Sequence, residues 1–180
     1  MKRLLLLFVL AAATVLAQPA VLDLGPHGAL TLYFPEGWKV NTTSMAGQVT
    51  LTAEPAGNVN ATCTLQVSFP EQDRFDTKPR LKMRVEADGY PVAQGSVEGN
   101  AVAREFNLTT GFGFYCNFTD PELKGKPSEK GKYKVMSLGK IRLAPDVLLD
   151  VQIMSDSFRD KGYQDLLGAI EGMEFKPGRG

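Results

Sequence analysis

The sequence predicts an α+β fold in which an antiparallel β-sheet is flanked by helices. Several segments alternate apolar and polar residues with a period of two, as half-buried strands do. Two further segments carry helix signals, one inserted between strands and one near the end of the chain. Runs of strands joined by short turns, with one inserted and one terminal helix, indicate α+β architecture, in which the helices cover the apolar faces of the sheet.

The first predicted strands lie between residues 29 and 69. Residues 29–34 alternate in polarity, a Pro-Glu-Gly turn follows at 35–37, and the chain restarts as a strand at Trp38. Residues 48–53 and 61–69 are the next two strands, joined through a Pro-Ala-Gly-Asn turn. In the last strand every odd-numbered residue is apolar and every even-numbered one is Thr, Gln or Ser. One face of that strand is therefore expected to be buried and the other wet.

The inserted helix is predicted from Lys78 to Gly89. The Asp-Thr-Lys-Pro sequence at 76–79 is typical of a helix start, because Pro fits the first turn of a helix. Leu81 and Val85 then fall on one face, and Gly89 is expected to end the helix.

Four more strands and a terminal helix complete the chain. The predicted strands are residues 101–108, 112–118, 133–143 and 147–154, separated by a Lys-rich connection and a Pro-Asp turn. Asp156-Ser157 is expected to cap the terminal helix. Its apolar stripe consists of Phe158, Tyr163, Leu166, Leu167 and Ile170. Residues 173–175 form a short closing strand.

The composition excludes several classes of protein. Of 180 residues, 43% are hydrophobic and 22% are charged, which is ordinary for a globular domain and unlike a disordered tail or a collagen-like rod. The 20 Lys and Arg residues balance the 20 Asp and Glu residues, so the chain has no general attraction for phosphates. We therefore expect no nucleic acid among the partners.

The N-terminus resembles an export signal. Lys2 and Arg3 precede an apolar run from Leu4 to Leu16, and Ala17 offers a small residue at a cleavage site. The apolar run has about 13 residues, which is too short to span roughly 30 Å of hydrocarbon. We expect residues 1–17 to be a cleaved signal peptide and residues 18–180 to form one domain, periplasmic or secreted, without a transmembrane segment. The competing interpretation is a retained membrane anchor.

The two cysteines are predicted to form a disulfide. Cys63 and Cys116 both fall on the apolar parity of their strands, and an even number of cysteines in an exported chain favours pairing. Closing this loop of about 54 residues would stabilise the fold by roughly 4 kcal/mol in the chain-entropy model. The alternative is two separate buried thiols, and the wide spacing disfavours a redox-active pair.

The sequence shows no catalytic constellation and predicts no cofactor and no metal. His27, the single histidine, lies in a Gly-Pro-His-Gly turn without a nearby nucleophile or orienting carboxylate, so we interpret it as a solvated turn residue. One His and two core-facing Cys do not make a zinc site. Asp156 and Asp160 could touch a hard cation, but they are expected to serve the helix N-terminus. Four Asn-x-Ser/Thr triplets, at Asn41, Asn60, Asn107 and Asn117, are interpreted as chance occurrences in a Thr-rich β protein.

A basic segment is the one candidate partner surface with a charge signature. It contains Lys124, Lys126, Lys130, Lys132 and Lys134. These lysines could bind an anion or a partner protein, or they could be a solvated connection that keeps a sheet edge soluble. Trp38 is a second candidate contact point, although its place beside a turn favours packing.

The order of these elements resembles the PsbP-like superfamily, including its DcrB-like and DUF1795 bacterial members. The matching features are residues 32–40 (Leu-Tyr-Phe-Pro-Glu-Gly-Trp-Lys-Val), the helix near 78–89, the hairpin at 99–101, the last helix and residues 173–175. The resemblance implies an antiparallel sheet sandwiched by helices (α/β/α) and a non-enzymatic accessory or binding role. It carries over no catalytic residue.

Two hypotheses for function follow. The first is an exported, non-catalytic binding or accessory protein of the bacterial envelope that acts through contact with another envelope protein. The alternative is a hydrolase with an unrecognised carboxylate site. An enzyme should show a pocket with convergent polar groups, whereas a binding module should show a shallow, partly apolar face.

Overall fold

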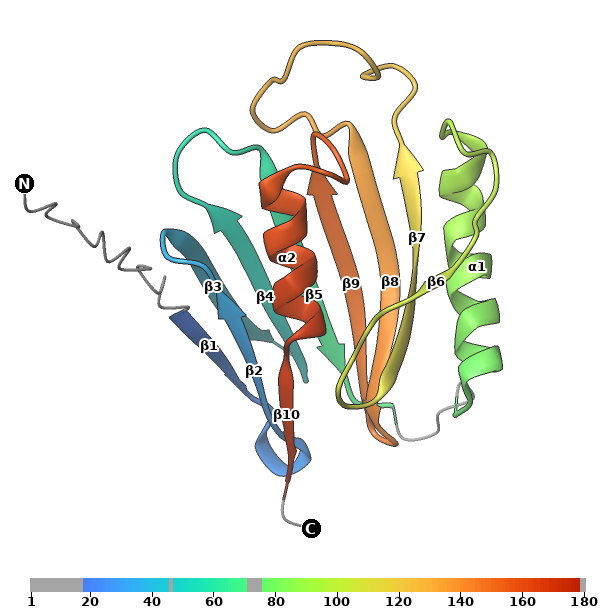
Figure 1. The fold of residues 1–180 in the computed structure, drawn as a ribbon. Helices are drawn as coiled ribbons and strands as arrows, with labels where there is room; N and C mark the ends of the chain where they lie inside the picture. Colours follow the sequence, from blue (N-terminus) through green and yellow to red (C-terminus); the bar gives the residue numbers. More distant parts are fainter. Residues whose placement is uncertain (1–17, 46, 71–75, 179–180) are drawn as a thin grey trace, which may run out of the picture.

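Ten strands in two antiparallel sheets, together with two α-helices, make up the computed structural model, which describes residues 18–45, 47–70 and 76–178 (Figure 1). This confirms the predicted α+β class. The larger sheet has seven strands, each antiparallel to its neighbours. In spatial order they are β3 (Trp38–Met45), β4 (Gln48–Pro55), β5 (Ala61–Ser68), β9 (Val147–Ser155), β8 (Val135–Ala144), β7 (Phe112–Thr119) and β6 (Arg104–Glu105).

A smaller sheet of three strands packs against the larger one. It consists of β1 (Gln18–Asp23), β2 (Gly28–Phe34) and β10 (Glu174–Pro177), with β2 in the centre. A 3-10 turn, Gly25–His27, joins β1 to β2. The apolar parity of β2 buries Leu30, Leu32 and Phe34 in the core between the two sheets. Strand β1 was not among the predicted strands.

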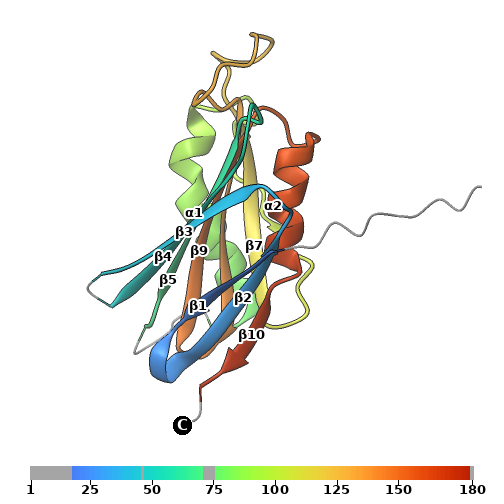
Figure 2. The same cartoon turned by 90° about the vertical axis from the view of Figure 1, so that its left-hand side faces the viewer.

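The two helices lie on opposite faces of the seven-stranded sheet (Figure 2). Helix α1 (Lys78–Gln94) covers β7 and β8, where Leu81 and Val85 pack against Phe114 and Phe118. Helix α2 (Lys161–Glu171) packs on β5 and β9 from the other side and also contacts β2. On the face that carries α1, the helix therefore covers β7 and β8 and leaves β3, β4 and β5 without a covering layer.

Two of the predicted element boundaries are wrong, for physical reasons that the structure shows. Helix α1 continues through Gly89 to Gln94, because Gly89 provides space for close packing: a Cβ there would lie 3.0 Å from Phe118 Cζ. Of the predicted strand at 101–108, only Arg104–Glu105 pairs with β7.

The cap of α2 is Asp160, one of the two acids expected to serve this helix N-terminus, and not the predicted Asp156-Ser157. The helix begins after Asp160, whose carboxylate accepts a hydrogen bond of 2.7 Å from the backbone N–H of Tyr163. Ser155 Oγ donates to the same carboxylate at 2.7 Å and so fixes its position. Asp160 therefore satisfies the N-terminal donors of the helix that were assigned to residues 156–157.

The structure does not form the predicted disulfide, and both cysteines are buried free thiols. Cys63 on β5 faces the main core under α2, whereas Cys116 on β7 faces the small core under α1. Strands β9 and β8 lie between them, which puts the two Cα atoms about 14 Å apart at a strand spacing of about 4.8 Å. A disulfide needs a Cα separation below about 7 Å. Each thiol lies on the apolar side of its own strand, but the two apolar sides face opposite cores of the protein.

The two thiols are expected to be unreactive in the folded protein. Burial raises the pKa of Cys63 to about 12, and burial together with the charge of Glu86 raises the pKa of Cys116 to about 11. Only the thiolate reacts with Ellman's reagent. We expect no labelling of the native protein, labelling of both cysteines in denaturant, and the same melting temperature with and without reductant. A melting temperature that falls on reduction would contradict the free-thiol assignment.

The predicted signal peptide, residues 1–17, lies outside the described residues. In the segments that the structure does describe, neither helix has the length and apolar character that crossing a membrane requires.

Candidate binding groove

The face of the seven-stranded sheet that carries α1 is half uncovered. Helix α1 occupies β7 and β8, and β3, β4, β5 and β9 present polar side chains in two rows that follow the strand register and end on β8 at Lys140 and Leu138. The first row is Thr43, Thr50, Gln66, Asp150 and Lys140; the second is Asn41, Thr52, Thr64, Gln152 and Leu138. Directly paired residues project to the same face, so these side chains form one continuous surface beside the helix.

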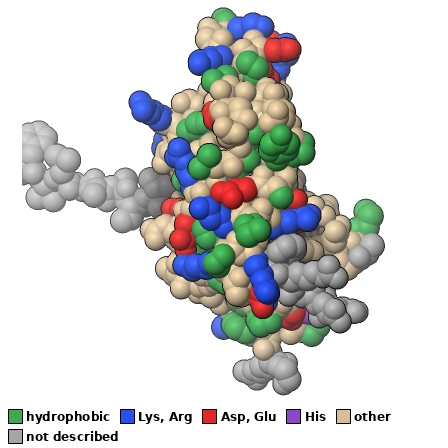
Figure 3. All heavy atoms as spheres, turned by 90° about the vertical axis from the view of Figure 1, so that its right-hand side faces the viewer, with side chains coloured by type: hydrophobic (Ala, Val, Ile, Leu, Met, Phe, Trp, Pro, Cys, Tyr) green, Lys and Arg blue, Asp and Glu red, His purple; other side chains and the backbone are tan. Residues whose placement is uncertain are grey.

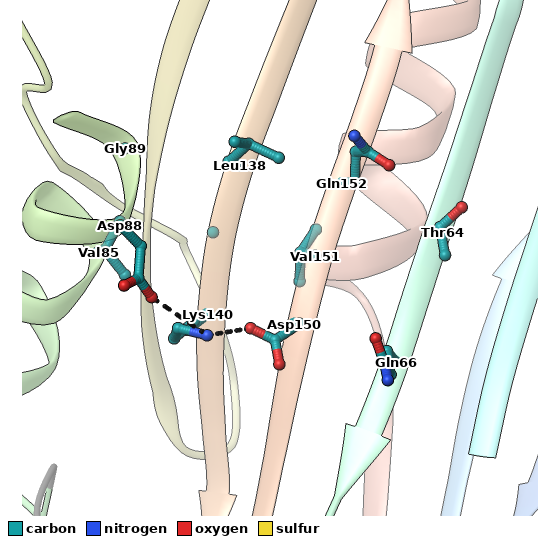
Figure 4. Close-up of a pocket in the computed structure, with 11 residues that line it drawn as sticks. Thr64, Gln66, Val85, Asp88, Gly89, Leu138, Lys140, Asp150, Val151 and Gln152 are labelled. Atoms are coloured by element: carbon teal, nitrogen blue, oxygen red, sulfur yellow. Dashed lines mark hydrogen bonds and ion pairs between the residues drawn. The ribbon is translucent and has the colours of Figure 1, made fainter. Parts of the chain in front are cut away.

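A groove runs between this surface and α1. Its lower part has a volume of about 310 Å³ and is floored by β8, β9 and β5 (Figure 4). Val85, Asp88 and Gly89 of α1 form one wall, and Thr64 and Gln66 lie on the opposite side. Because Gly89 has no side chain, it brings α1 close to the sheet at this level.

An ion-pair bridge fixes the width of the lower groove. The Lys140 ammonium bonds the carboxylate of Asp150 on the next strand and lies 3.4 Å from the carboxylate of Asp88 on α1 (Figure 4). Arg84 donates to Asp88 at 2.9 Å on the outer side of the helix. Only 16% of the Lys140 side chain is exposed, so this ion pair is less screened than a surface pair.

The upper part of the groove is largely apolar, with Asp120 and Lys134 as the charged residues of its lining. It has a volume of about 370 Å³ between the C-terminal end of α1 and the upper ends of β7, β8 and β9. Its apolar lining is Pro91, Val92, Phe118, Tyr133, Met136 and Met154. Met136 and Met154 are direct cross-strand partners, one step along the same two strands from Leu138 and Gln152 of the lower groove. The two parts therefore follow one line along β8 and β9.

The predicted basic segment lies above this groove. We call residues 120–134 the lysine loop; Figure 3 shows Lys and Arg side chains gathered at that end of the molecule. Lys126, Lys132 and Lys134 line a hollow of about 320 Å³, which we call the lysine pocket, together with Ser128 and Glu129. Lys124 and Lys130 are not part of its lining. The structure thus brings together three of the five predicted lysines.

Asn60 holds the lysine loop in place, and its role was missed in the sequence. Its side-chain amide donates to the carbonyls of Glu129 (3.1 Å) and Lys132 (2.9 Å), and its Oδ1 accepts from the backbone N–H of Gly131 (3.0 Å). It also donates to Asp156 at 3.0 Å. Its side chain is buried, with 8% of the residue exposed. In this Asn-x-Thr triplet, the Asn60 side chain is therefore fully engaged in internal hydrogen bonds.

Asp156 provides the second attachment of the lysine loop. Its carboxylate accepts hydrogen bonds from both Asn60 and Ser128. The residue that was assigned to a helix cap or a cation therefore belongs to the loop contacts. In the described part of the chain, no group of three or more His, Cys, Asp and Glu side chains is arranged to hold a metal ion.

The structure corrects the assignment of His27 as a solvated turn residue. Its Nδ1 lies 2.5 Å from Oδ2 of Asp146, and its ring stacks on Phe69 at a centroid distance of 4.1 Å. Asp146 lies in the turn between β8 and β9, 119 residues away in sequence, so no local pattern could reveal this partner. The contact ties the turn between β1 and β2 of the small sheet to the β8–β9 turn at one end of the large sheet.

The His27–Asp146 contact adds a small stabilisation of the fold that is lost in acid. The hydrogen bond with His27 lowers the pKa of the Asp146 carboxyl, and the charges of His27 and Arg142 act in the same direction. A carboxyl with a lowered folded pKa stabilises the fold above its ordinary value of 3.8, and the contribution disappears as the pH falls through the folded pKa. Because the side chain is 51% exposed, the contribution is at most about 0.5 kcal/mol.

Urea unfolding of Asp146→Asn at several pH values tests this contact. We expect a small loss of stability near neutral pH that shrinks as the pH falls below 3.8, the ordinary pKa of the carboxyl. The exposed Glu36→Gln change is the control. A difference from wild type that grows in acid would contradict the assigned sign.

Two other polar or aromatic candidates are structural. Trp38 is packed, 9% exposed, with its ring centroid 6.0 Å from that of Phe34, as its place beside the turn predicted. Tyr163 of α2 shares a hydrogen bond of 2.7 Å with Ser137, which donates to Asn117 at 2.6 Å. Burial raises the pKa of Tyr163 to about 12, so its hydroxyl stays protonated in this buried network.

Comparison with known proteins adds no assignment: no protein-family model and no curated protein sequence matches the chain. The class that the geometry itself defines is an α+β domain with an open sheet face beside a helix.

Proposed function

We propose that the protein is an exported, non-catalytic binding or accessory protein of the bacterial envelope, and that the groove beside α1 is its contact surface for another protein. The supporting observation is that α1 covers only half of one sheet face and leaves an open groove beside it. The groove combines an apolar part with a part rich in hydrogen-bonding groups, which suits the side chains and backbone of a partner segment.

Binding is favoured over the hydrolase alternative by the state of the carboxylates in the groove. Asp88 and Asp150 are the two acids that converge there, and both are in contact with the ammonium of Lys140. A general acid must carry a proton that it can give up. Here both carboxylates are instead engaged by one ammonium group, as a structural bridge between α1 and the sheet.

The family and compartment belong to the same proposal. The placement of α1 and α2 on opposite sides of an antiparallel sheet supports the resemblance to the PsbP-like superfamily. An envelope partner requires that the protein is exported and cleaved after Ala17. Sequencing the N-terminus of the protein from the periplasmic fraction tests this requirement. Gln18 is the expected first residue, and an intact Met1 in the cytosolic fraction would contradict export.

Affinity capture from envelope extracts, compared between matched variants, tests the groove. The probe variant is Gln66→Arg, which places a bulky cation on the groove floor, and the control is Val21→Arg on the exposed outer face of the small sheet. We expect a partner that wild type and Val21→Arg retain and Gln66→Arg loses, with equal melting temperatures for the two variants. A partner retained equally by all three would exclude the groove as the contact surface.

A further inference from the structure

The lysine loop is a built structure with a fixed backbone. Its segment 129–132 is bonded at three backbone groups by the buried Asn60 side chain, and Ser128 is bonded by Asp156. Hydrogen bonds to a buried amide hold a loop in one conformation and reduce the entropy that it loses when a ligand binds. The lysine pocket is therefore pre-organised, although the loop itself is exposed to solvent.

The lysine pocket has cationic groups available for a ligand. Lys132 pairs with Glu129 at 2.9 Å, whereas Lys126 and Lys134 form no ion pair with any residue that the structure describes. Glu129 in the same lining is engaged by Lys132, so the ammonium groups of Lys126 and Lys134 favour an anionic occupant. Carboxylates and phosphates both meet this requirement.

The lysine pocket continues into the apolar upper groove. Lys134 lines both hollows, and the neighbouring Tyr133 belongs to the upper groove with Met136 and Met154. An occupant that reaches from the lysine pocket into the groove therefore meets ammonium groups first and apolar side chains next. Such an order matches a ligand with an acidic end and an apolar body.

The polar groups of the lower groove favour a peptide over a lipid as the occupant. Thr64 and Gln66 on its floor make no side-chain hydrogen bond with another described residue, and the Lys140–Asp150 ion pair lies beside them. An alkyl chain would bury these groups without satisfying them, at a cost of about 1–3 kcal/mol each. The N–H and C=O groups of an extended peptide can pair with them.

We propose that the groove and the lysine pocket together bind an extended acidic peptide segment, with its carboxylates between Lys126 and Lys134 and its apolar side chains on Met136 and Met154. This inference rests on the proposed function and specifies the partner segment. It also gives the basic loop a specific role, with two of its five lysines contacting the ligand.

Fluorescence anisotropy with labelled peptides tests the inference on the mature protein. The probes are fluorescein-labelled dodecapeptides in which Val and Leu alternate with Thr and Ser, with an Asp-Asp pair at either end; the control peptides carry Lys-Lys instead. The protein variants are Lys126→Ser/Lys134→Ser and the matched control Lys124→Ser/Lys130→Ser, which removes the same charge outside the pocket.

We expect saturable binding of one Asp-Asp peptide, about tenfold weaker in the Lys126/Lys134 variant and within about twofold of wild type in the control. Equal losses in both variants would show a general charge effect and overturn the inference. Lysine-dependent binding to phosphatidylglycerol vesicles without peptide binding would also overturn it, in favour of a lipid. If affinity capture depends on Gln66 but not on Lys126 and Lys134, the proposed function stands and the acidic segment is excluded.

Discussion

Replacing Asn60 with Ala is expected to lower the free energy of unfolding by about 2–4 kcal/mol and to release the lysine loop. The change removes four hydrogen bonds at once and leaves the carbonyl of Lys132 and the N–H of Gly131 without their protein partner, while the carbonyl of Glu129 keeps only the N–H of Lys132. Each buried polar group left unsatisfied costs about 1–3 kcal/mol, and water can recover part of that at a loop. Urea unfolding measures the loss of stability, and hydrogen exchange at residues 129–132 measures the release.

Asn41→Ala is the matched control, because Asn41 also begins an Asn-x-Thr triplet but is exposed on β3. Its stability should stay within about 0.5 kcal/mol of wild type. If Asn60→Ala and Asn41→Ala are equally stable, or if the loop amides of Asn60→Ala stay as protected as in wild type, Asn60 does not hold the loop. Asn60→Ala should also weaken binding of the acidic peptide, because a released loop no longer presents a fixed pocket.

Local patterning was sufficient to predict most strands. The period-two segments at 29–34, 48–53, 61–69 and 147–154 correspond to β2, β4, β5 and β9 within two residues at either end. Such segments are readable because each buries one face against a continuous core. Only two residues of the predicted strand at 101–108 pair with a neighbour, and its sequence, Ala-Val-Ala-Arg-Glu-Phe-Asn-Leu, lacks the alternation of the other segments.

The faces of the sheet could not be predicted from the parity within each strand. Cys63 and Cys116 look equivalent in the sequence, since each lies on the apolar side of an alternating segment. Whether two apolar parities share a core depends on the strand order and on which layer covers each face. Here α1 covers the Cys116 side of β7 and leaves the same face of β5 open, so the two thiols belong to different cores.

The candidate site escaped prediction for a related reason. The groove is formed by residues from α1, β5, β8 and β9, and its central ion pair joins Lys140 to acids on two different elements. Charge density along the chain did identify the lysines. It could not distinguish the three that line the pocket from Lys124 and Lys130, because Asn60 and Asp156, far away in sequence, determine how the loop is folded.

Replacing Gly139 with Ala is expected to cost about 2–3 kcal/mol, although Ala has the higher intrinsic propensity in ordered structure. Gly139 lies in the middle of β8, where a Cβ would stand 2.6 Å from the carbonyl oxygen of Phe114 and 2.8 Å from Cβ of Tyr115. These are atoms of the adjacent strand, held by the β7–β8 register, so they cannot move aside as a flexible side chain would. An atom of the Phe106 ring lies 3.0 Å from the same Cβ position, so this ring, whose centroid is 4.5 Å from that of Tyr115, would also be displaced.

Gly168→Ala is expected to have the opposite effect, a gain in stability. Gly168 lies in α2, is exposed, and has no atom within 4 Å of a Cβ placed there. This change should therefore raise the stability by about 0.5–1 kcal/mol through reduced backbone entropy of the unfolded chain. Urea unfolding of the two variants compares them directly. If Gly139→Ala is as stable as wild type, β7 and β8 are not packed as closely as the register requires, and the groove floor that they support would have a different shape.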